Sequence, residues 1–250
     1  MLGEIYRELI ACLDRRELVV LSTVVEGRGQ GNELLIWPRG ETLGDLGSPR
    51  LNQRAALYAE QIAPTFQSGR KSFRWDDHEV DVFFEVYPPP PELIVVGAVH
   101  VAIPLIGLAK GLGYRTVVVD PRSAFATKER FPQADEILST WPEEAFQKID
   151  LHESSYLAVL SHDMKIDLPA LAAALRSPAR YIGALGSSRT HAKRVKALQA
   201  EGFSNEEMGR IHAPIGFDLG GRRAEEIALS IMAEMVAAGH GRPTRKHAGD

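Results

Sequence analysis

Residues 94–102 read IVVGAVHVA, and this stretch decides the fold class of the larger part of the chain. Ile94, Val95 and Val96 predict a buried strand, Gly97 permits a sharp turn, and a helical stretch follows. This is the order of a dinucleotide-binding turn, whose fingerprint is G-x-G-x-x-G or G-x-G-x-x-A. Gly97 and Ala102 occupy its first and third positions, but Val99 stands at the middle one. Either a dinucleotide site has lost one part, or a nucleotide-type fold serves another ligand.

Short apolar stretches alternate with helical ones through the rest of this region. The predicted strands are 93–96, 116–119, 156–160 and 181–185, and the predicted helices are 100–111, 166–175, 188–201 and 223–238. Wholly apolar strands that alternate with helices predict an α/β fold, in which helices cover both faces of a parallel sheet. In such a sheet ligands bind beyond the carboxyl ends of the strands.

The first 87 residues have a different pattern, which predicts a small α+β domain. Helices are predicted at 1–16 and 50–62, strands at 18–25 and 34–37, and a hairpin from 73–75 and 80–86. Four prolines, 88–91, then favour a stiff polyproline spacer. We therefore predict an N-terminal domain of residues 1–87, a C-terminal domain of residues 88–240 and a flexible tail of residues 241–250. A surface loop inside one domain is the alternative.

The composition excludes several classes of protein. The 250 residues are 44% hydrophobic and 25% charged, with a net charge of −4 and a pI near 6.1. No basic field attracts nucleic acid or a membrane surface, and no stretch is typical of a signal peptide or a membrane span. Cys12 is the one cysteine, which excludes a disulfide within the chain and a cysteine metal cluster. We expect a cytoplasmic protein without a metal site.

The turn at Gly97 is the first candidate site. Asp120 follows Gly97 by 23 residues, close to the spacing of about 20 for the acid that binds a ribose hydroxyl. Val99 adds a branched side chain and is expected to resist a positive φ, to narrow the turn and to weaken binding. His100 could donate to a phosphate or polarise a carbonyl. The alternatives are that Gly97 only permits the turn and that the His100 ring lies in solvent.

A Ser161-His162-Asp163 tripeptide follows the predicted strand at 156–160. Adjacent residues of an extended chain point in alternating directions, so they cannot form the relayed hydrogen bonds of a hydrolase triad. We expect His162 to face a ligand and Asp163 to cap or orient. A simple turn before the next helix is the alternative.

The segment 181–189, YIGALGSSR, is a candidate anion site. Gly183 and Gly186 expose backbone amides, Ser187 adds a hydroxyl, and Arg189 opens a helix whose dipole favours an anion. His191, Lys193 and Arg194 follow. A serine cap before a solvated basic face is the alternative.

The last candidate is the segment 211–221, IHAPIGFDLGG, which we expect to be an irregular loop. Long loops that hold a histidine and an acid, here His212 and Asp218, are more often sites than spacers. A metal site at these two residues has little support, because no second pair of ligands stands nearby.

Several ordered motifs together resemble the XdhC/CoxI family of accessory factors for molybdenum hydroxylases. They are residues 88–102, Asp120-Pro121-Arg122, FATKERFPQAD at 125–135, His162-Asp163, YIGALGSSR at 181–189 and HAPIGFDLGGRRAEEIALS at 212–230. The resemblance spans about residues 88–238 and implies a Rossmann-like C-terminal domain. It implies a maturation factor that binds the molybdenum cofactor, a phosphate-bearing pterin, and delivers it to an apoenzyme such as xanthine dehydrogenase.

The resemblance also implies that the chain does not itself turn over a metabolite, and it assigns no catalytic residue. Implied partners are the hydroxylase apoenzyme and a second copy of the chain in a homodimer, and a cysteine desulfurase is a further candidate. The residues expected to bind the cofactor are Gly97, Ala98, His100, Asp120, Arg122, His162, Asp163, Gly183, Gly186, Ser187, Arg189, His212 and Asp218.

The chain departs from the family pattern at two places. The family turn is usually G-A-G-H-V-A, and Val99 replaces its middle glycine. Cysteines usual in the family's N-terminal domain are absent from residues 44–52 and 76–86, and Cys12 matches neither. Two alternatives therefore stay open: an NAD-dependent oxidoreductase, in which Asp120 favours NAD over NADP, and an interaction protein whose ligand pocket has decayed.

Overall fold

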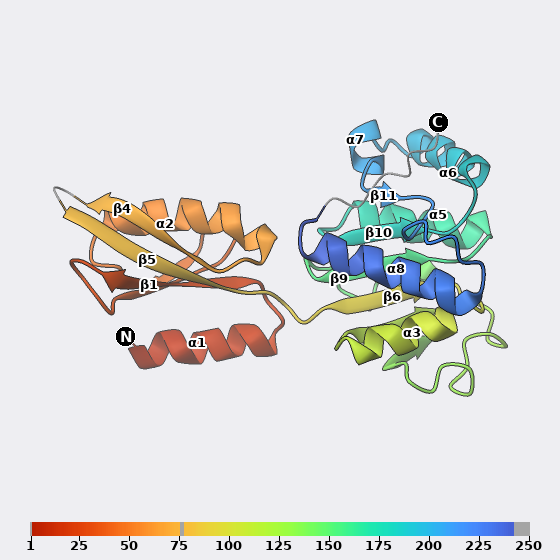
Figure 1. Ribbon diagram of the computed structural model, residues 1–250, viewed down its shortest axis with the longest axis horizontal. Helices are drawn as coiled ribbons and strands as arrows, with labels where there is room; N and C mark the ends of the chain where they lie inside the picture. Colours follow the sequence, from red (N-terminus) through yellow and green to blue (C-terminus); the bar gives the residue numbers. More distant parts are fainter. Residues whose placement is uncertain (1, 76–77, 243–250) are drawn as a thin grey trace. The chain divides into compact units, whose positions relative to one another are not determined.

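The computed structural model describes residues 2–75 and 78–242. The chain forms two compact units, which meet in sequence between Pro89 and Pro90 (Figure 1). The boundary lies two residues beyond the predicted one. Of the predicted tail at 241–250, residues 243–250 lie outside the described part of the chain.

The first unit is an antiparallel sheet with a helix on each face. Its strands lie in the order β3-β2-β1-β5-β4; their bounds are β1 Val19–Glu26, β2 Glu33–Ile36, β3 Thr42–Gly44, β4 Gly69–Trp75 and β5 His78–Tyr87. The helices are α1, Leu2–Asp14, and α2, Pro49–Ile62, which a 3-10 turn at Ala63–Thr65 extends. Val20 packs under α2 and its neighbours Val19 and Leu21 pack under α1, as alternation along a strand requires.

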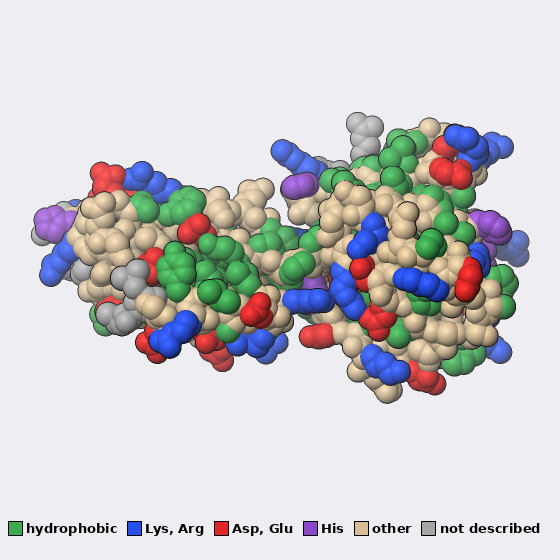
Figure 2. Space-filling view, turned by 90° about the horizontal axis from the view of Figure 1, so that it is seen from below, with side chains coloured by type: hydrophobic (Ala, Val, Ile, Leu, Met, Phe, Trp, Pro, Cys, Tyr) green, Lys and Arg blue, Asp and Glu red, His purple; other side chains and the backbone are tan. Residues whose placement is uncertain are grey.

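Helix α1 carries two apolar stripes at helical spacing. Ile5, Leu9 and Cys12 are buried against the sheet, whereas Tyr6, Ile10 and Leu13 are exposed. Figure 2 shows hydrophobic side chains gathered on this face of the first unit. An amphipathic helix needs only the first stripe to cover its own sheet, so the second is available to a partner.

The second unit is a six-stranded parallel sheet in the order β11-β10-β9-β6-β7-β8. Its strands are β6 Glu92–Val96, β7 Arg115–Val119, β8 Glu136–Leu138, β9 Ser155–Val159, β10 Tyr181–Ala184 and β11 Ile211–His212. The chain enters the sheet at the central strand β6 and adds β7 and β8 on one side of it. It then adds β9, β10 and β11 on the other side. This is the strand order of the Rossmann fold, with its switch point between β6 and β9.

Helices cover both faces of this sheet. They are α3 Ala102–Gly111, α4 Pro142–Ala145, α5 Met164–Leu175, α6 Ser188–Ala200, α7 Asn205–Met208 and α8 Ala224–Gly239. Leu93 and Val95 point into the core under α3 and α8, and Ile94 and Val96 into the core under α5 and α6. A strand buried on both faces must be apolar at every position, as β6 is after Glu92.

The predicted fold class is confirmed, but the sequence missed several short elements. Strands β3, β8 and β11 and helices α4 and α7 were not predicted. The segment at 211–221 is not irregular throughout, because Ile211 and His212 pair with Ile182 and Gly183 of β10. The missed strands have only two or three residues and each missed helix has only four, which is too short to show a clear periodicity in the sequence.

Candidate functional site

The candidate site is the edge of the parallel sheet where the strands end. The turn at Gly97 follows β6, Asp120 follows β7, Ser161 to Asp163 follow β9, and Gly186 to Arg189 follow β10. Because β7, β6, β9 and β10 are consecutive neighbours in the sheet, these four loops stand in a row across the switch point. The structure thus brings most of the predicted site residues to one edge.

Gly97 lets the two loops at the switch point approach each other closely. Its φ is +104°, and a Cβ there would lie 2.6 Å from the amide nitrogen of Ser161. The turn therefore needs glycine both for its backbone conformation and for the contact with the neighbouring loop.

Asp120 holds the Gly97 turn and Arg122 in place. Its side chain is fully buried; Oδ2 accepts the Ala98 amide at 2.8 Å and Arg122 Nη2 at 2.7 Å. Oδ1 accepts the Arg122 amide and Nε, both at 2.9 Å. Burial by itself would raise the pKa of Asp120, but these four hydrogen bonds outweigh it and lower the pKa. Both oxygens are occupied within the chain.

Val99 has no positive φ, in keeping with the expected resistance of a β-branched residue to that conformation. Positive φ angles occur among the described non-glycine residues only at Arg16 and Phe66. The Val99 amide donates to the Gly97 carbonyl at 2.9 Å, and its side chain packs against the core under α3 and α8. Val99 therefore fits the turn without a left-handed backbone, and its expected weakening of ligand binding stays a prediction.

Four polar side chains line the switch point on the solvent side. His100, Arg122, His162 and Asp163 are all exposed. Asp163 caps α5 by accepting the Lys165 amide at 2.9 Å, as the sequence predicted. It also lies close enough to Arg122 to raise the pKa of that guanidinium, after the larger effect of Asp120. The edge thus combines imidazoles, a guanidinium and a carboxylate.

The loop after β10 leaves its backbone amides without acceptors among the described residues. Ser187 caps α6 by accepting the Thr190 amide at 3.3 Å. The amides of Gly186, Ser187, Ser188 and Arg189 have no acceptor within residues 2–75 and 78–242. Gly186 has a φ of +144°, and Arg189 is exposed in the first turn of the helix.

Beneath this loop lies a buried ion pair that the sequence did not reveal. Arg194 and Asp167 are both fully buried; Nε and Nη2 donate to Asp167 Oδ2 at 3.0 and 2.5 Å. Nη2 also donates to the carbonyls of Leu185 at 2.9 Å and Ser161 at 3.4 Å. Burial raises the pKa of Asp167 although Arg194 opposes the shift. Arg194 therefore ties the loop after β9 to the loop after β10.

Three buried polar atoms of this cluster lack a partner among the described residues. They are Arg194 Nη1, Asp167 Oδ1 and His191 Nδ1. Burial and the charge of Arg194 lower the pKa of His191. Buried polar atoms without a partner are few in native proteins, so three of them in one cluster mark a place where a ligand could bind.

Gly183 and His212 lie instead under α8, in a second hydrogen-bonded cluster. A Cβ on Gly183 would lie 2.4 Å from Ile215 Cδ1. The His212 Nδ1 lies 3.0 Å from Glu234 Oε1, and its ring stacks on Tyr181 with centroids 4.5 Å apart. Glu234 Oε2 accepts Tyr181 Oη at 2.5 Å and the Gly216 amide at 2.7 Å. This cluster anchors β10 and the chain after β11 to α8.

Asp218 forms a local turn rather than joining either cluster. Its Oδ1 accepts the Gly220 amide at 3.0 Å, in an exposed position. Glu226 closes the same segment by accepting the amides of Arg222 and Arg223 at 2.9 and 3.0 Å.

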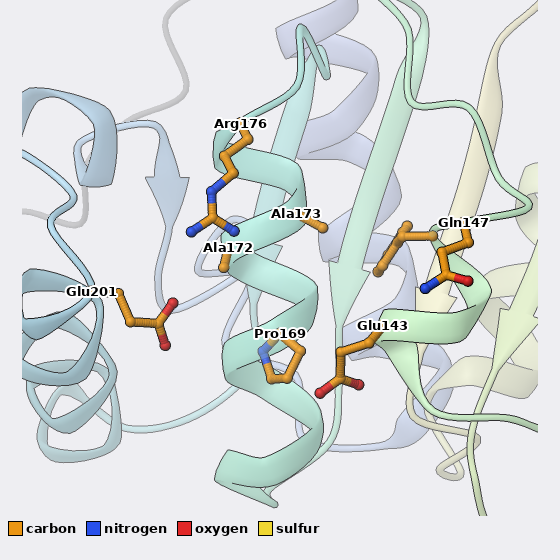
Figure 3. A pocket seen from close by; sticks show the side chains of 8 residues that line it. Glu143, Gln147, Pro169, Ala172, Ala173, Arg176 and Glu201 are labelled. Atoms are coloured by element: carbon orange, nitrogen blue, oxygen red, sulfur yellow. The ribbon is translucent and has the colours of Figure 1, made fainter.

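A surface groove of about 400 Å³ lies between α4 and α5 (Figure 3). None of the predicted site residues lines it. Its charged lining residues are Glu143, Arg176 and Glu201, and the Arg176 guanidinium lies over the Phe203 ring at 4.8 Å. Because two carboxylates and one guanidinium line the groove, its charge does not favour the binding of an anion.

Cys12 is not a reactive thiol. It is fully buried, and burial, with Glu17, raises its pKa to about 11, so the thiolate is scarce at neutral pH. Within residues 2–75 and 78–242 no three His, Cys, Asp or Glu side chains are grouped to hold a metal ion. None of the helices described is long and apolar enough to cross a membrane.

The fold defines a Rossmann-type α/β unit linked to a small α+β unit. The family described as the XdhC Rossmann domain matches residues 93–235, more than half of the chain. The chain therefore belongs to the XdhC family.

Three bacterial proteins are similar to parts of the chain. A protein of Bacillus subtilis described as a probable xanthine dehydrogenase subunit is 29% identical over 64% of this chain and 46% of its own length. The "Molybdenum cofactor insertion chaperone PaoD" of Escherichia coli is 40% identical over 40% of this chain and 31% of its own. The "Uncharacterized protein YqeB" of Escherichia coli is 24% identical over 89% of this chain and 44% of its own length. The chain thus spans less than half the length of each of these three relatives.

A solved structure, described as a xanthine dehydrogenase from Bacillus halodurans, has the same fold. It aligns with a TM-score of 0.55 and 19% identity over 96% of this chain and 97% of that chain.

Proposed function

We propose that this protein binds the molybdenum cofactor and delivers it to a molybdenum hydroxylase apoenzyme such as xanthine dehydrogenase. The observation that carries the proposal is the XdhC family match over residues 93–235, together with the similarity to the insertion chaperone PaoD. In this role the cofactor is cargo, and the protein does not turn over a metabolite.

The edge of the sheet supports a phosphate-bearing cargo. Four free amides in the loop Gly186–Arg189 and the unpartnered Arg194 Nη1 below it are donors without acceptors among the residues described. His100, Arg122 and His162 stand exposed at the neighbouring loops, where the remainder of such a ligand would lie. These are groups that bind and orient an anion.

The alternative of an NAD-dependent oxidoreductase has less support. Its ribose would need the carboxylate of Asp120, which is fully buried and already accepts four hydrogen bonds. Calorimetry with NAD(H) separates the two, since the maturation role predicts no saturable heat.

The protein partners proposed are the hydroxylase apoenzyme, a cysteine desulfurase and a second copy of the chain, all in the cytoplasm. The exposed stripe of Tyr6, Ile10 and Leu13 on α1 supports association with another protein. Sedimentation of the full chain tests the homodimer.

Binding of the cofactor is tested by titration of the purified full chain with molybdopterin under anaerobic conditions. We expect saturable binding and a gain in hydroxylase activity when the loaded protein meets the apoenzyme. Absence of binding, while a relative with glycine at the position of Val99 binds, would contradict the proposal for this chain.

A further inference from the structure

The turn at Gly97 and the loop at Gly186 both join a strand to a helix, but their amides are used differently. In the Gly97 turn the amides of Gly97, Ala98 and Val99 donate within the chain, to Val119, Asp120 and Gly97. Only those of His100 and Val101 lack an acceptor among the residues described. In the loop Gly186–Arg189 all four amides lack one within the same described ranges.

The α6 helix that follows adds a positive electrostatic potential, which favours a bound anion. It has 13 residues, long enough for its dipole to place positive potential at the first turn. No acidic residue stands in that turn, and Arg189 adds a positive charge at the loop itself. An anion at this place would meet donors and positive charge together.

Arg194 gives an independent reason to place a ligand here. Its side chain is fully buried, yet Nη1 has no partner within the described chain. Nη1 lies 3.3 Å from the position that a Cβ of Gly186 would occupy. The donor therefore faces the notch that the missing side chain of Gly186 leaves in the loop, and a buried guanidinium N–H without an acceptor is costly.

We infer that the loop Gly186–Arg189, with Arg194 beneath it, is a phosphate subsite, and that the fingerprint turn at Gly97 is not one. The natural ligand class is a phosphate monoester, and the identity of that ligand rests on the proposed function. Strands β10 and β6 are two positions apart in the sheet, so the subsite is about 10 Å from the Gly97 turn. The rest of the ligand would extend over Ser161 to Asp163 toward His100.

The subsite is tested with inorganic phosphate and the full chain, by isothermal titration calorimetry at constant ionic strength. Gly186→Ala fills the notch above Arg194 and strains a φ of +144°; we expect affinity to fall at least about tenfold. Gly202→Ala is the matched control, because Gly202 has a φ of +94° just after the same helix and no neighbour within 4 Å. It should bind as the wild type does.

A second pair of variants keeps the test independent of folding. Arg189 is exposed, so Arg189→Ala leaves the fold intact and should weaken phosphate about three- to tenfold. Lys196→Ala removes the same charge from an exposed position near the other end of α6 and should change affinity less than about twofold. Equal effects of the two substitutions, or unchanged binding by both Gly186→Ala and Arg189→Ala, would overturn the inference.

The outcome separates the subsite from the proposed function. Molybdopterin binding that survives both Gly186→Ala and Arg189→Ala would overturn the subsite and leave the maturation role standing. Phosphate binding that both variants weaken, without any molybdopterin binding, would support the subsite and overturn the role.

Discussion

The Gly97 turn and the Gly186 loop stand two strands apart on the same sheet edge and differ in what holds them. Asp120 and the backbone satisfy most donors of the Gly97 turn, and the contact with Ser161 closes it. The Gly186 loop keeps four amides that no described residue accepts, above a buried guanidinium. A glycine fingerprint therefore marks where the backbone bends, whereas unsatisfied donors mark where an anion can bind.

The largest expected effect follows from removing the guanidinium under the Gly186 loop. Arg194→Met leaves the buried Asp167 carboxylate without its partner and should lower the free energy of unfolding of the second unit by about 3–5 kcal/mol. Urea denaturation followed by circular dichroism measures this.

Arg189→Met is the control for that variant, because Arg189 is exposed on the same helix. It should change the free energy of unfolding by less than about 0.5 kcal/mol. Equal losses in the two variants would mean that the ion pair does not support the loop.

Gly97→Ala tests whether the first turn is closed by contact. The new Cβ would meet the Ser161 backbone at 2.6 Å and take a φ of +104°. We expect a loss of about 2–4 kcal/mol in the free energy of unfolding. Gly113→Ala, with φ of +82° and no neighbour within 4 Å, should lose only about 1–2 kcal/mol. If Gly113→Ala lost more free energy of unfolding than Gly97→Ala, the contact between Gly97 and Ser161 would not be what closes the turn.

Asp120→Asn tests the hydrogen bonds that satisfy the first turn. At pH 7 this substitution should lower the free energy of unfolding by about 2 kcal/mol. The folded-state pKa of Asp120 is lowered, so its contribution is full above the unfolded pKa of about 3.9 and is lost as the pH falls through the folded value. The difference between wild type and variant in urea should therefore shrink below about pH 4.

The turn residue Asp218 supplies the control for this substitution. At pH 7, Asp218→Asn should change the free energy of unfolding by less than about 0.5 kcal/mol, because its one hydrogen bond is exposed. A difference between wild type and Asp120→Asn that stays constant down to about pH 3 would show that the carboxylate charge is not what holds the turn.

Val99→Gly should have the smallest effect. From the sequence we expected this change to strengthen binding; the amide pattern now predicts a phosphate affinity within about twofold of wild type. It should cost about 1 kcal/mol of stability, because the side chain packs on the core and glycine gains freedom in the unfolded chain. A tenfold gain in affinity by calorimetry would place the anion at the Gly97 turn instead.

The sequence predicted the parallel sheet because its middle strands are short, nearly continuous apolar stretches. It also predicted Gly97, Gly186 and Ser187 as loop residues, since glycine and a capping serine mark turns locally. It could not show that Ser161 packs against Gly97, a contact between residues 64 positions apart in the chain (161 − 97).

Arg194 shows where the sequence could have been used further. Because Arg194 follows His191 and Lys193 closely in the sequence, the simplest interpretation is that it belongs to a basic, solvent-exposed face of the helix. Yet His191, Arg194 and Leu198 are three and four residues apart, the spacing of one helical face, and Leu198 is fully buried. That spacing indicates a buried arginine, but its partner Asp167, on another helix, could be found only from the fold.

The most direct test of the central claim is the amide NMR spectrum of the ¹⁵N-labelled full chain during titration with inorganic phosphate. We predict saturable shifts of the Gly186, Ser187, Ser188 and Arg189 amides, with those of Gly97, Ala98 and Val99 unmoved. Saturable shifts at Gly97 to Val99 with none at Gly186 to Arg189 would contradict it.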